Sequence, residues 1–496
     1  MQVTGGRSGS ARASVHDDGF STVERTVVAG GYCVGCGACA AMSAGALTMK
    51  LDELGTYRPV RTTDAAISGD MEPICPFADK ARDETAIGDS LFGSSAPHDS
   101  RIGRYHALYA GHVATAEFRL RGSSGGFGSW LPANLIKSGI VDAVLHVKPL
   151  APASEGGRPL FGFQLSRDAS EIQAGAKSRY YPVEFSELRE LLAATPGRVA
   201  VVGLPCFIKA LRLMALADPS IGDRIAVTIG LVCGHLKSTR FADYLAWQGG
   251  IAPGTLRAID FRHKLPGRAA MDYGVRAIGP DGTPVDLPMR SLFGHQWGYG
   301  LFKLQACDFC DDVLAETADI TIGDAWIPPY ESDPAGTNIV VVRRPDLVGI
   351  IEEARTTGEI MLDPLDADAV GHSQAGGLRH RRQGLAVRLA EKDRNGEWRP
   401  QKRIAAAPDL RGRFAKMHLH RMSVSAESHV AFAEALARRK ADYFAQRMGP
   451  LMRRLDRLSR SPFQNVMRSP VAMALARLTP AILKRLLRRL AGRRGR

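Results

Sequence analysis

The sequence predicts a mixed α/β protein with a cysteine-rich N-terminal segment and a helical, strongly basic C-terminal extension. Apolar runs of strand length alternate with helical patterns through the middle of the chain, which is typical of α/β domains. Three closely spaced cysteines precede these runs, and a short alternating run at 46–51 after them predicts a strand. Helix-forming residues follow Pro400 and predict one long helix over about 427–447. We therefore divide the chain into four regions, at 1–30, 31–100, 101–400 and 401–496.

Length and composition limit the class of protein. The 496 residues, 45% of them hydrophobic, suffice for two or three domains. The region 1–30 is rich in Gly, Ser, Ala and Thr, which predicts a flexible leader. Eight cysteines without an apolar signal segment near Met1 indicate a cytoplasmic, reducing compartment and metal or redox use of the thiols. We find no apolar run of about 18 residues and expect no membrane-spanning helix.

The net charge of +14 is concentrated near the C-terminus. Residues 438–496 carry 17 Lys and Arg against two acidic residues, so the rest of the chain is close to neutral. Few aromatic residues that stack on bases accompany these cations, which argues against specific nucleic-acid binding. The stretch Ile482–Leu490 combines apolar positions at helical spacing with a cationic opposite face. Two alternatives stay open for it: peripheral contact with an anionic surface such as the inner membrane, and a solvated basic tail.

The region 31–100 contains a ferredoxin-like cysteine motif. Cys33, Cys36 and Cys39 have the C-x2-C-x2-C spacing that holds 4Fe-4S clusters in ferredoxin-type proteins. Ser43 stands where the ferredoxin pattern has its next cysteine, and Cys75, which precedes a proline, can replace it. We predict that these four cysteines hold one cluster. A zinc site is the alternative, although zinc usually takes two separated C-x2-C pairs.

A second set of four cysteines follows strand-like runs of the α/β region. Cys206 and Cys233 each end an apolar run of strand length. Because sites collect at the carboxyl ends of strands in an open parallel sheet, these two thiols should converge. Cys307 and Cys310 complete the set as a C-x2-C pair before the strand-like residues 318–326. Two clusters, or one cluster with a structural second set, both fit the eight cysteines.

A Gly- and Ser-rich loop opens a predicted helix at 127–137. Ser123, Ser124, Gly125 and Gly126 can present hydroxyl and backbone N–H groups to an anion, aided by the helix dipole. The loop is a candidate cradle for a phosphate or a flavin diphosphate, and an ordinary turn is the alternative.

Other side chains have both a functional and a structural interpretation. Lys177 and Tyr180 lie in a cationic and aromatic stretch that would either line a flavin or form solvated surface. His235 fits a structural role better than a catalytic one. Asp324 and Trp326 fit a strand-end turn and a core aromatic residue.

The order of these motifs resembles the coenzyme F-420 hydrogenase/dehydrogenase beta-subunit family. The resemblance rests on the three-cysteine segment, the Ser-Ser-Gly-Gly loop, the motifs Gly-Leu-Pro-Cys and Gly-Leu-Val-Cys, and the C-x2-C pair with its following strand. It covers roughly residues 32–382. Members of that family are iron-sulfur flavoproteins, and they include chlorophyll-related reductases and proteins encoded beside polysaccharide-synthesis genes.

The resemblance implies an iron-sulfur protein that carries FAD in a mixed α/β flavin domain at 101–400, and the eight cysteines suffice for two 4Fe-4S clusters. We expect electrons to pass between a ferredoxin or a partner subunit, the clusters and FAD, and then to a deazaflavin or another small organic acceptor. Backbone N–H groups around Gly35 and Gly37 would stabilise the reduced first cluster. The resemblance places six residues near the flavin: Ser123, Ser124, Gly125, Gly126, Lys177 and Tyr180.

One alternative comes from a different class of protein. The same scaffold could serve as an accessory protein of a membrane-associated polysaccharide-synthesis or modification system, held at the membrane by its basic tail.

Overall fold

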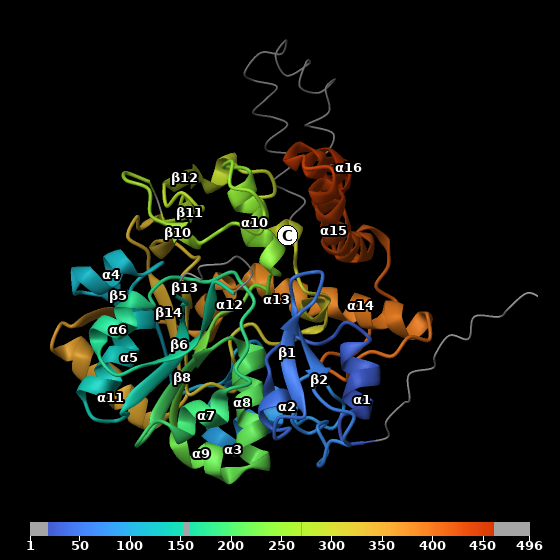
Figure 1. The fold of residues 1–496 in the computed structure, drawn as a ribbon. Coiled ribbons are helices and arrows are strands. Elements are labelled where there is room, and N and C mark those ends of the chain that lie inside the picture. Colours follow the sequence, from blue (N-terminus) through green and yellow to red (C-terminus); the bar gives the residue numbers. More distant parts are fainter. Residues whose placement is uncertain (1–17, 152–158, 269, 461–496) are drawn as a thin grey trace, which may run out of the picture.

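The computed structural model describes residues 18–151, 159–268 and 270–460, which surround one large sheet (Figure 1). Its spatial strand order is β15-β5-β14-β13-β9-β8-β6-β7. The strands β6, β8, β9 and β13 run parallel to one another, whereas β7, β14 and β5 pair antiparallel with their neighbours. The mixed α/β class is confirmed, but the expected parallel arrangement is wrong for the outer strands. The eight strands are β5 (Ala107–Val113), β6 (Ala143–Pro149), β7 (Phe161–Ser166), β8 (Val199–Gly203), β9 (Ile225–Leu231), β13 (Ile320–Asp324), β14 (Asn338–Val342) and β15 (Ile360–Pro364).

Helices cover both faces of this sheet. α5 (Phe127–Lys137) has the predicted bounds and packs with α11 (Pro345–Thr356) on one face. α8 (Pro205–Ala217) packs on the other face. Because successive side chains of a strand point to opposite faces, Val201 and Val202 of β8 contribute to two different cores.

The N-terminal segment is helical from the start of the described residues. α1 (Ser21–Val23) continues into a π-helix at Glu24–Val28. Phe20, Val23 and Val27 are buried in the main hydrophobic core. The expected flexible leader is therefore wrong for residues 18–30, because apolar side chains three to four positions apart form one buried helical face. Residues 1–17 lie outside the described part of the chain.

Smaller elements frame the body. A three-stranded antiparallel sheet lies beside α10 (Thr239–Trp247), above the large sheet in Figure 1. The predicted strand after the cysteine motif is present as β1 and pairs with β2. These elements are β1 (Leu47–Leu51), β2 (Tyr57–Arg61), β3 (His98–Asp99), β4 (Gly103–Arg104), β10 (Ala258–His263), β11 (Gly274–Ile278), β12 (Pro284–Pro288), α2 (Ala38–Ala41), α3 (Glu84–Phe92), α4 (Ala116–Arg121), α6 (Ala169–Ala174), α7 (Leu188–Ala193), α9 (Pro219–Arg224), α12 (Ala367–Ser373), α13 (Ala375–Arg381) and α14 (Gln383–Arg394).

The C-terminal extension is a helical hairpin. α15 (Gly412–Ala437) and α16 (Ala441–Ser459) pack against each other, and α15 also contacts α10 (Figure 1). The sequence predicted one helix over residues 427–447, and this prediction is wrong. The chain reverses at Arg439, whose φ of +54° lies in the left-handed region that ends helices.

The hairpin buries an aromatic face of both helices. The rings of Phe432 and Phe444 lie 5.6 and 5.3 Å from the ring of Phe302. A single straight helix could not bring both rings to the same neighbour, because twelve residues of α-helix extend about 18 Å. Aromatic burial therefore explains the break, which no Gly or Pro marks in the sequence.

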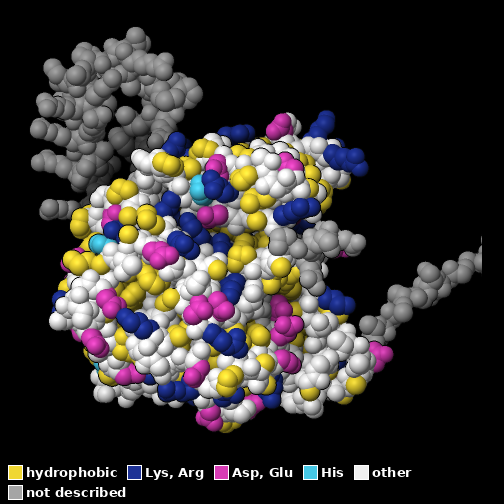
Figure 2. Space-filling view, turned by 60° about the vertical axis from the view of Figure 1, so that its left-hand side comes forward, with side chains coloured by type: hydrophobic (Ala, Val, Ile, Leu, Met, Phe, Trp, Pro, Cys, Tyr) yellow, Lys and Arg dark blue, Asp and Glu magenta, His cyan; other side chains and the backbone are white. Residues whose placement is uncertain are grey.

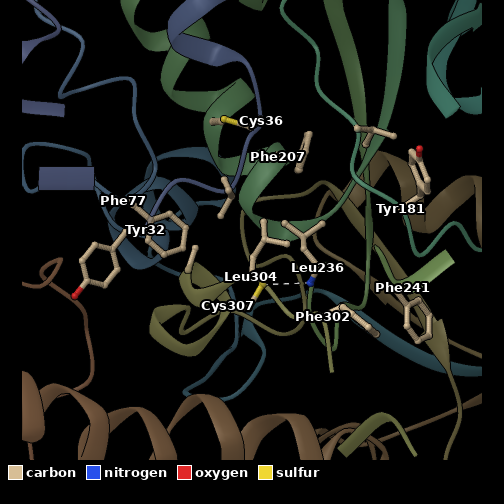
Figure 3. Packing of buried hydrophobic residues seen from close by; sticks show 14 of the residues in the cluster. Tyr32, Cys36, Phe77, Tyr181, Phe207, Leu236, Phe241, Phe302, Leu304 and Cys307 are labelled. Atoms are coloured by element: carbon tan, nitrogen blue, oxygen red, sulfur yellow. Dashed lines mark hydrogen bonds between the residues drawn. The ribbon is translucent and has the colours of Figure 1, made fainter. Parts of the chain in front are cut away.

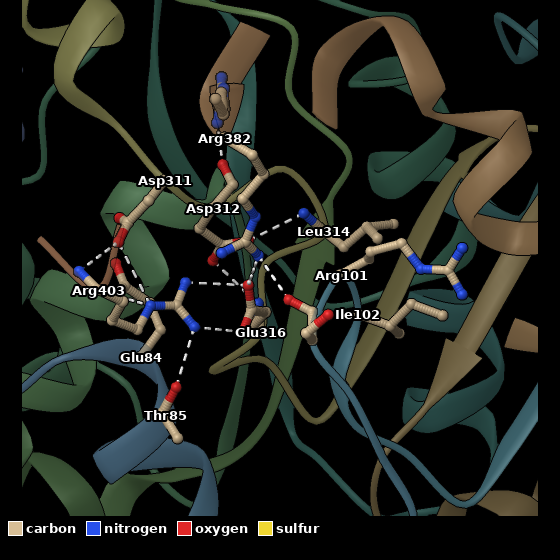
Figure 4. A network of polar contacts seen from close by, with 12 residues as sticks. Glu84, Thr85, Arg101, Ile102, Asp311, Asp312, Leu314, Glu316, Arg382 and Arg403 are labelled. Atoms are coloured by element: carbon tan, nitrogen blue, oxygen red, sulfur yellow. Dashed lines mark hydrogen bonds and ion pairs between the residues drawn. The ribbon is translucent and has the colours of Figure 1, made fainter. Parts of the chain in front are cut away.

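A buried ionic network joins three stretches of the chain. Arg403, which precedes α15, contacts Glu316 at 2.6 Å, Asp311 at 3.3 Å and Glu84 at 3.4 Å (Figure 4). None of these side chains is more than 12% exposed. Arg403 thereby connects the C-terminal extension to α3 and to the loop that follows Cys307 and Cys310. Removing one partner of such a buried pair typically costs about 3–5 kcal/mol.

The described surface is mixed in charge. Figure 2 shows Lys and Arg interspersed with Asp and Glu over the face that it presents. In the described part of the chain, no helix combines the length and the hydropathy needed to cross a membrane. Ile482–Leu490 lies outside the described residues, so membrane contact through this stretch stays a prediction.

Candidate functional site

The four cysteines of the N-terminal segment lie around one small cavity. Cys33, Cys36, Cys39 and Cys75 line it together with apolar side chains. All four thiols are free. Burial raises the pKa of Cys75 to about 12 and raises the pKa of Cys36 and Cys39, and the neighbouring thiols add to each rise. The structure thus brings together the four residues that the sequence grouped. At Cys36, Cys39 and Cys75 the raised pKa favours the neutral thiol, and a bound metal would favour the thiolate.

Two glycines shape this loop. Gly35 and Gly37 have φ values of +70° and +90°, in the region that favours glycine. A Cβ atom at Gly35 would lie 2.8 Å from the carbonyl oxygen of Tyr57, and one at Gly37 would lie 2.8 Å from a carboxylate oxygen of Glu184. The Gly35 N–H donates to the Sγ atom of Cys33 at 3.4 Å. Such N–H···S contacts stabilise thiolates and reduced clusters.

The second set of cysteines lies where β8 and β9 end. Cys206 belongs to the first turn of α8, Cys233 follows β9, and Cys307 lies in a 3-10 helix that ends before Cys310. Burial raises the pKa of Cys206, and the three other thiols of this set add to the rise. All four are free. The three other thiols therefore lie close enough to Cys206 to act on its pKa.

Two N–H donors reach the sulfur atoms of the second set. The Leu236 backbone N–H donates to Cys307 Sγ at 3.2 Å (Figure 3). The Arg381 guanidinium donates to Cys310 Sγ at 3.1 Å and to the carbonyl of Gly234 at 2.8 Å. Arg381 is only 1% exposed. Sequence reasoning missed it, because nothing in a run of Arg and His at a helix end marks one arginine as buried.

The two cysteine sets are adjacent. Cys36 of the first set contributes to the raised pKa of Cys206 in the second. Both sets adjoin one apolar cluster that includes Phe207 and Leu304 (Figure 3). Among the described residues, no three His, Cys, Asp or Glu side chains converge on a point where a single metal ion would bind. A cubane cluster takes one thiolate at each iron corner, and each of the two sets supplies four free cysteines that are buried or partly buried.

The Gly- and Ser-rich loop borders a cavity of about 290 Å³. Gly125 is not part of its lining; a Cβ atom there would lie 2.7 Å from Asn338 Oδ1, so this glycine lets the loop approach β14. Cys233 also lines the cavity, which therefore adjoins the second cysteine set. The lining includes five of the six residues that the resemblance placed near a flavin: Ser123, Ser124, Gly126, Lys177 and Tyr180.

The loop is held in a shape that suits an anion. The Ser178 N–H donates to Ser123 Oγ at 2.8 Å, and Ser124 Oγ donates to the Thr337 carbonyl at 3.0 Å. Gly126, with a φ of +93°, stands immediately before the N-terminus of α5. The partial positive charge of that helix end therefore faces the cavity together with the Lys177 ammonium.

Sequence reasoning missed two further side chains of this cavity. Arg262 donates to Asp324 Oδ2 at 3.1 Å and to the Ser123 carbonyl at 3.3 Å, so Asp324 holds an arginine at the cavity wall and is more than a strand-end turn. Trp297 stacks on His235, with ring centroids 4.2 Å apart. Burial lowers the pKa of His235 well below its usual value, so the imidazole is neutral. These contacts join residues far apart in sequence, which no local motif encodes.

A second, larger cavity of about 1230 Å³ adjoins the first. Its other wall comes from α13 and the C-terminal hairpin, including Arg379, His418 and Arg421. The residues that line both cavities are Tyr180, Val232, Cys233, Gly234, His235, Arg262, Trp297 and Asp324.

Comparison with known proteins identifies the family. The model of the coenzyme F-420 hydrogenase/dehydrogenase beta subunit N-terminus matches residues 108–190, and the model of its C-terminus matches residues 197–368. Together they match just over half of the chain. This class of proteins consists of oxidoreductases and their subunits. The chain belongs to the coenzyme F-420 hydrogenase/dehydrogenase beta-subunit family, which confirms the resemblance seen in the sequence.

One solved structure and the curated proteins complete the comparison. A chain of the xenon-derivatised F-420-reducing nickel-iron hydrogenase complex from Methanosarcina barkeri is similar at 16% identity, with a TM-score of 0.45. The similarity covers 62% of this chain and 98% of that chain. No curated protein matches.

Proposed function

We propose that the chain is an iron-sulfur flavoprotein oxidoreductase. It passes electrons between 4Fe-4S clusters and FAD, and on to a deazaflavin such as coenzyme F-420 or another small organic acceptor. One observation carries the proposal: two sets of four free cysteines adjoin each other, and Cys233 of the second set also lines the cavity of the Gly- and Ser-rich loop. The family match supports an oxidoreductase over the accessory-protein alternative.

The order of the sites suggests a route for electrons. Three of the four cysteines of the first set are partly exposed, against two of the four in the second set, so we place the approach of a ferredoxin or a partner subunit at the first set. From Cys36 the route continues to Cys206, and from Cys233 to the cavity. A flavin bound in that cavity would supply the exchange between one-electron and two-electron chemistry.

The chain's own residues position and shield the reactants. Ser123 and the N-terminus of α5 would hold the diphosphate, and Lys177 would balance its charge. The stacked pair His235 and Trp297 lines both cavities and would limit the access of water to a reactant bound beside it. Arg262, fixed by Asp324, presents a permanent cation where negative charge develops on reduction.

The test is anaerobic purification followed by iron, sulfide, zinc and flavin determination, with EPR of the reduced protein. We expect about eight irons and one FAD per chain and the spectra of two interacting cubanes. About four irons would restrict the proposal to a single cluster. Zinc in place of iron, without flavin, would overturn it.

A further inference from the structure

The larger cavity has a strong excess of positive charge. Among the described residues, six Lys and Arg side chains and a single carboxylate, Asp324, line it. Three of the six basic groups already have acidic partners, since Arg262 pairs with Asp324, Lys303 with Asp308 and Arg460 with Asp456.

Three arginines of the lining have no carboxylate within ion-pair distance among the described residues. They are Arg379 on α13 and Arg413 and Arg421 on α15. Arg413 donates to the carbonyls of Arg457 and Leu458, which carry no net charge. Arg413 and Arg421 are partly buried and Arg379 is exposed. Even partial burial of cations without counter-ions is unfavourable, so an anionic ligand in the cavity would balance their charge.

Unsatisfied polar atoms point to the same ligand. His418 is 2% exposed and lines the cavity, yet neither of its ring nitrogens has a hydrogen-bond partner among the described residues. The Nε atom of the neighbouring Arg421 is also buried and unpaired within the described structure. Buried polar groups are nearly always satisfied in folded proteins, so these atoms await a partner that the chain does not supply.

We infer that the larger cavity, called the chamber below, binds the organic acceptor. We further infer that α13 and α15 select an acceptor that carries a phosphate or carboxylate group. The inference rests on the proposed function, because the chamber adjoins the cavity assigned to the flavin. It goes beyond the family match, which ends at residue 368, before α13 and α15 begin. The C-terminal extension is thus a specificity-determining wall of the site.

A matched pair of probes tests this. Deazariboflavin phosphate and uncharged deazariboflavin differ only in the phosphate group, and their binding to the FAD-loaded chain is measured by fluorescence anisotropy. We expect the phosphate ester to bind about tenfold more tightly, since a charge-assisted contact is worth about that factor. Arg421→Gln and Arg379→Gln should each remove most of this preference and leave the binding of the uncharged probe unchanged.

The control is Lys416→Gln, which removes one positive charge from an exposed position of α15 that does not line the chamber. Arg379 is exposed as well, so its variant should fold even if the Arg421 variant does not. Equal affinities for the two probes, or an equal effect of Lys416→Gln, would overturn the inference in a chain that retains FAD and iron. A preparation without FAD and iron would instead overturn the proposed function, and this inference with it.

Discussion

The two cysteine sets differ in what surrounds their sulfur atoms. At the first set the described hydrogen-bond donors are backbone groups such as the Gly35 N–H. The Lys209 ammonium opposes the raised pKa of Cys75 through its charge, without a hydrogen bond to sulfur. At the second set a buried guanidinium touches sulfur directly. Arg381 opposes the burial-driven rise in pKa of Cys233, Cys307 and Cys310.

This difference in the surroundings of the sulfur atoms would affect the reduction potential of a cluster bound by each set. A reduced cluster is more negative than an oxidised one, so a nearby cation and N–H···S bonds favour reduction. Asp311 and Asp312 act in the opposite direction, but the influence of Arg381 on Cys310 is larger. If both sets hold clusters, the second should have the higher potential, and electrons entering at the first set would move downhill toward the cavity.

Removing one ligand from each set should have the largest effect. Cys36→Ser and Cys307→Ser should each lower the iron content by about half, because a cubane needs all four thiolates for stable binding. EPR should then show which signal belongs to which set. Loss of all iron in both variants would mean that the two sets do not assemble independently.

The buried ionic network around Arg403 should be the next most sensitive feature. Arg403→Gln leaves Glu84, Asp311 and Glu316 without their shared cation, and we expect the free energy of unfolding to fall by about 3–5 kcal/mol. Urea denaturation of the anaerobic protein measures this. Arg399→Gln is the matched control, since Arg399 pairs with the partly exposed Asp393, and it should cost less than about 1 kcal/mol. Similar losses in both variants would contradict the network's importance.

Replacing Arg381, whose guanidinium contacts the second set, tests the expected difference in reduction potential between the two sets. Arg381→Met should lower the potential of the second cluster by on the order of 60 mV, the equivalent of one charge-assisted hydrogen bond. The potential of the first cluster should stay unchanged in the same EPR-monitored redox titration. Arg382→Met is the control, because Arg382 contacts Glu316 and not sulfur. Equal shifts in the potentials of both clusters would show that the substitution changes the fold in general and does not act locally on the second cluster.

Removing the end of the chain should have the smallest effect on either set. All eight cysteines, and the described residues that line the two cavities, precede residue 461. Deletion of residues 461–496 should therefore leave iron, flavin and both potentials unchanged, and sedimentation with anionic vesicles would report any membrane role separately. Loss of iron or flavin on this deletion would show that the tail contributes to the sites.

Features that depend on the spacing of nearby residues could be predicted from the sequence. The C-x2-C-x2-C run, the cysteines after strand-like stretches and the Gly- and Ser-rich loop each carry their chemistry within a few residues, and α5 has the predicted bounds of 127–137. The sequence did not foresee contacts made only by tertiary packing. Arg381 resembles any helix-end arginine, Arg262 lies in an ordinary strand, and the break at Arg439 depends on aromatic neighbours at residues far away in the chain.

Arg403 contacts residues that are made much earlier in the chain, and this affects the order in which these parts can pack during synthesis. A chain emerges from the ribosome N-terminus first, so α3 and the second cysteine pair are made well before their shared cation. Lys209 and Arg382, which pair with Glu84 and Glu316, are made earlier, but the cation that Glu84, Asp311 and Glu316 share is absent until Arg403 has been translated. We expect this loop to remain open to incoming iron during that interval and to close as the C-terminal hairpin docks. Limited proteolysis of chains released before and after residue 403 would show whether the loop becomes protected only in the longer one.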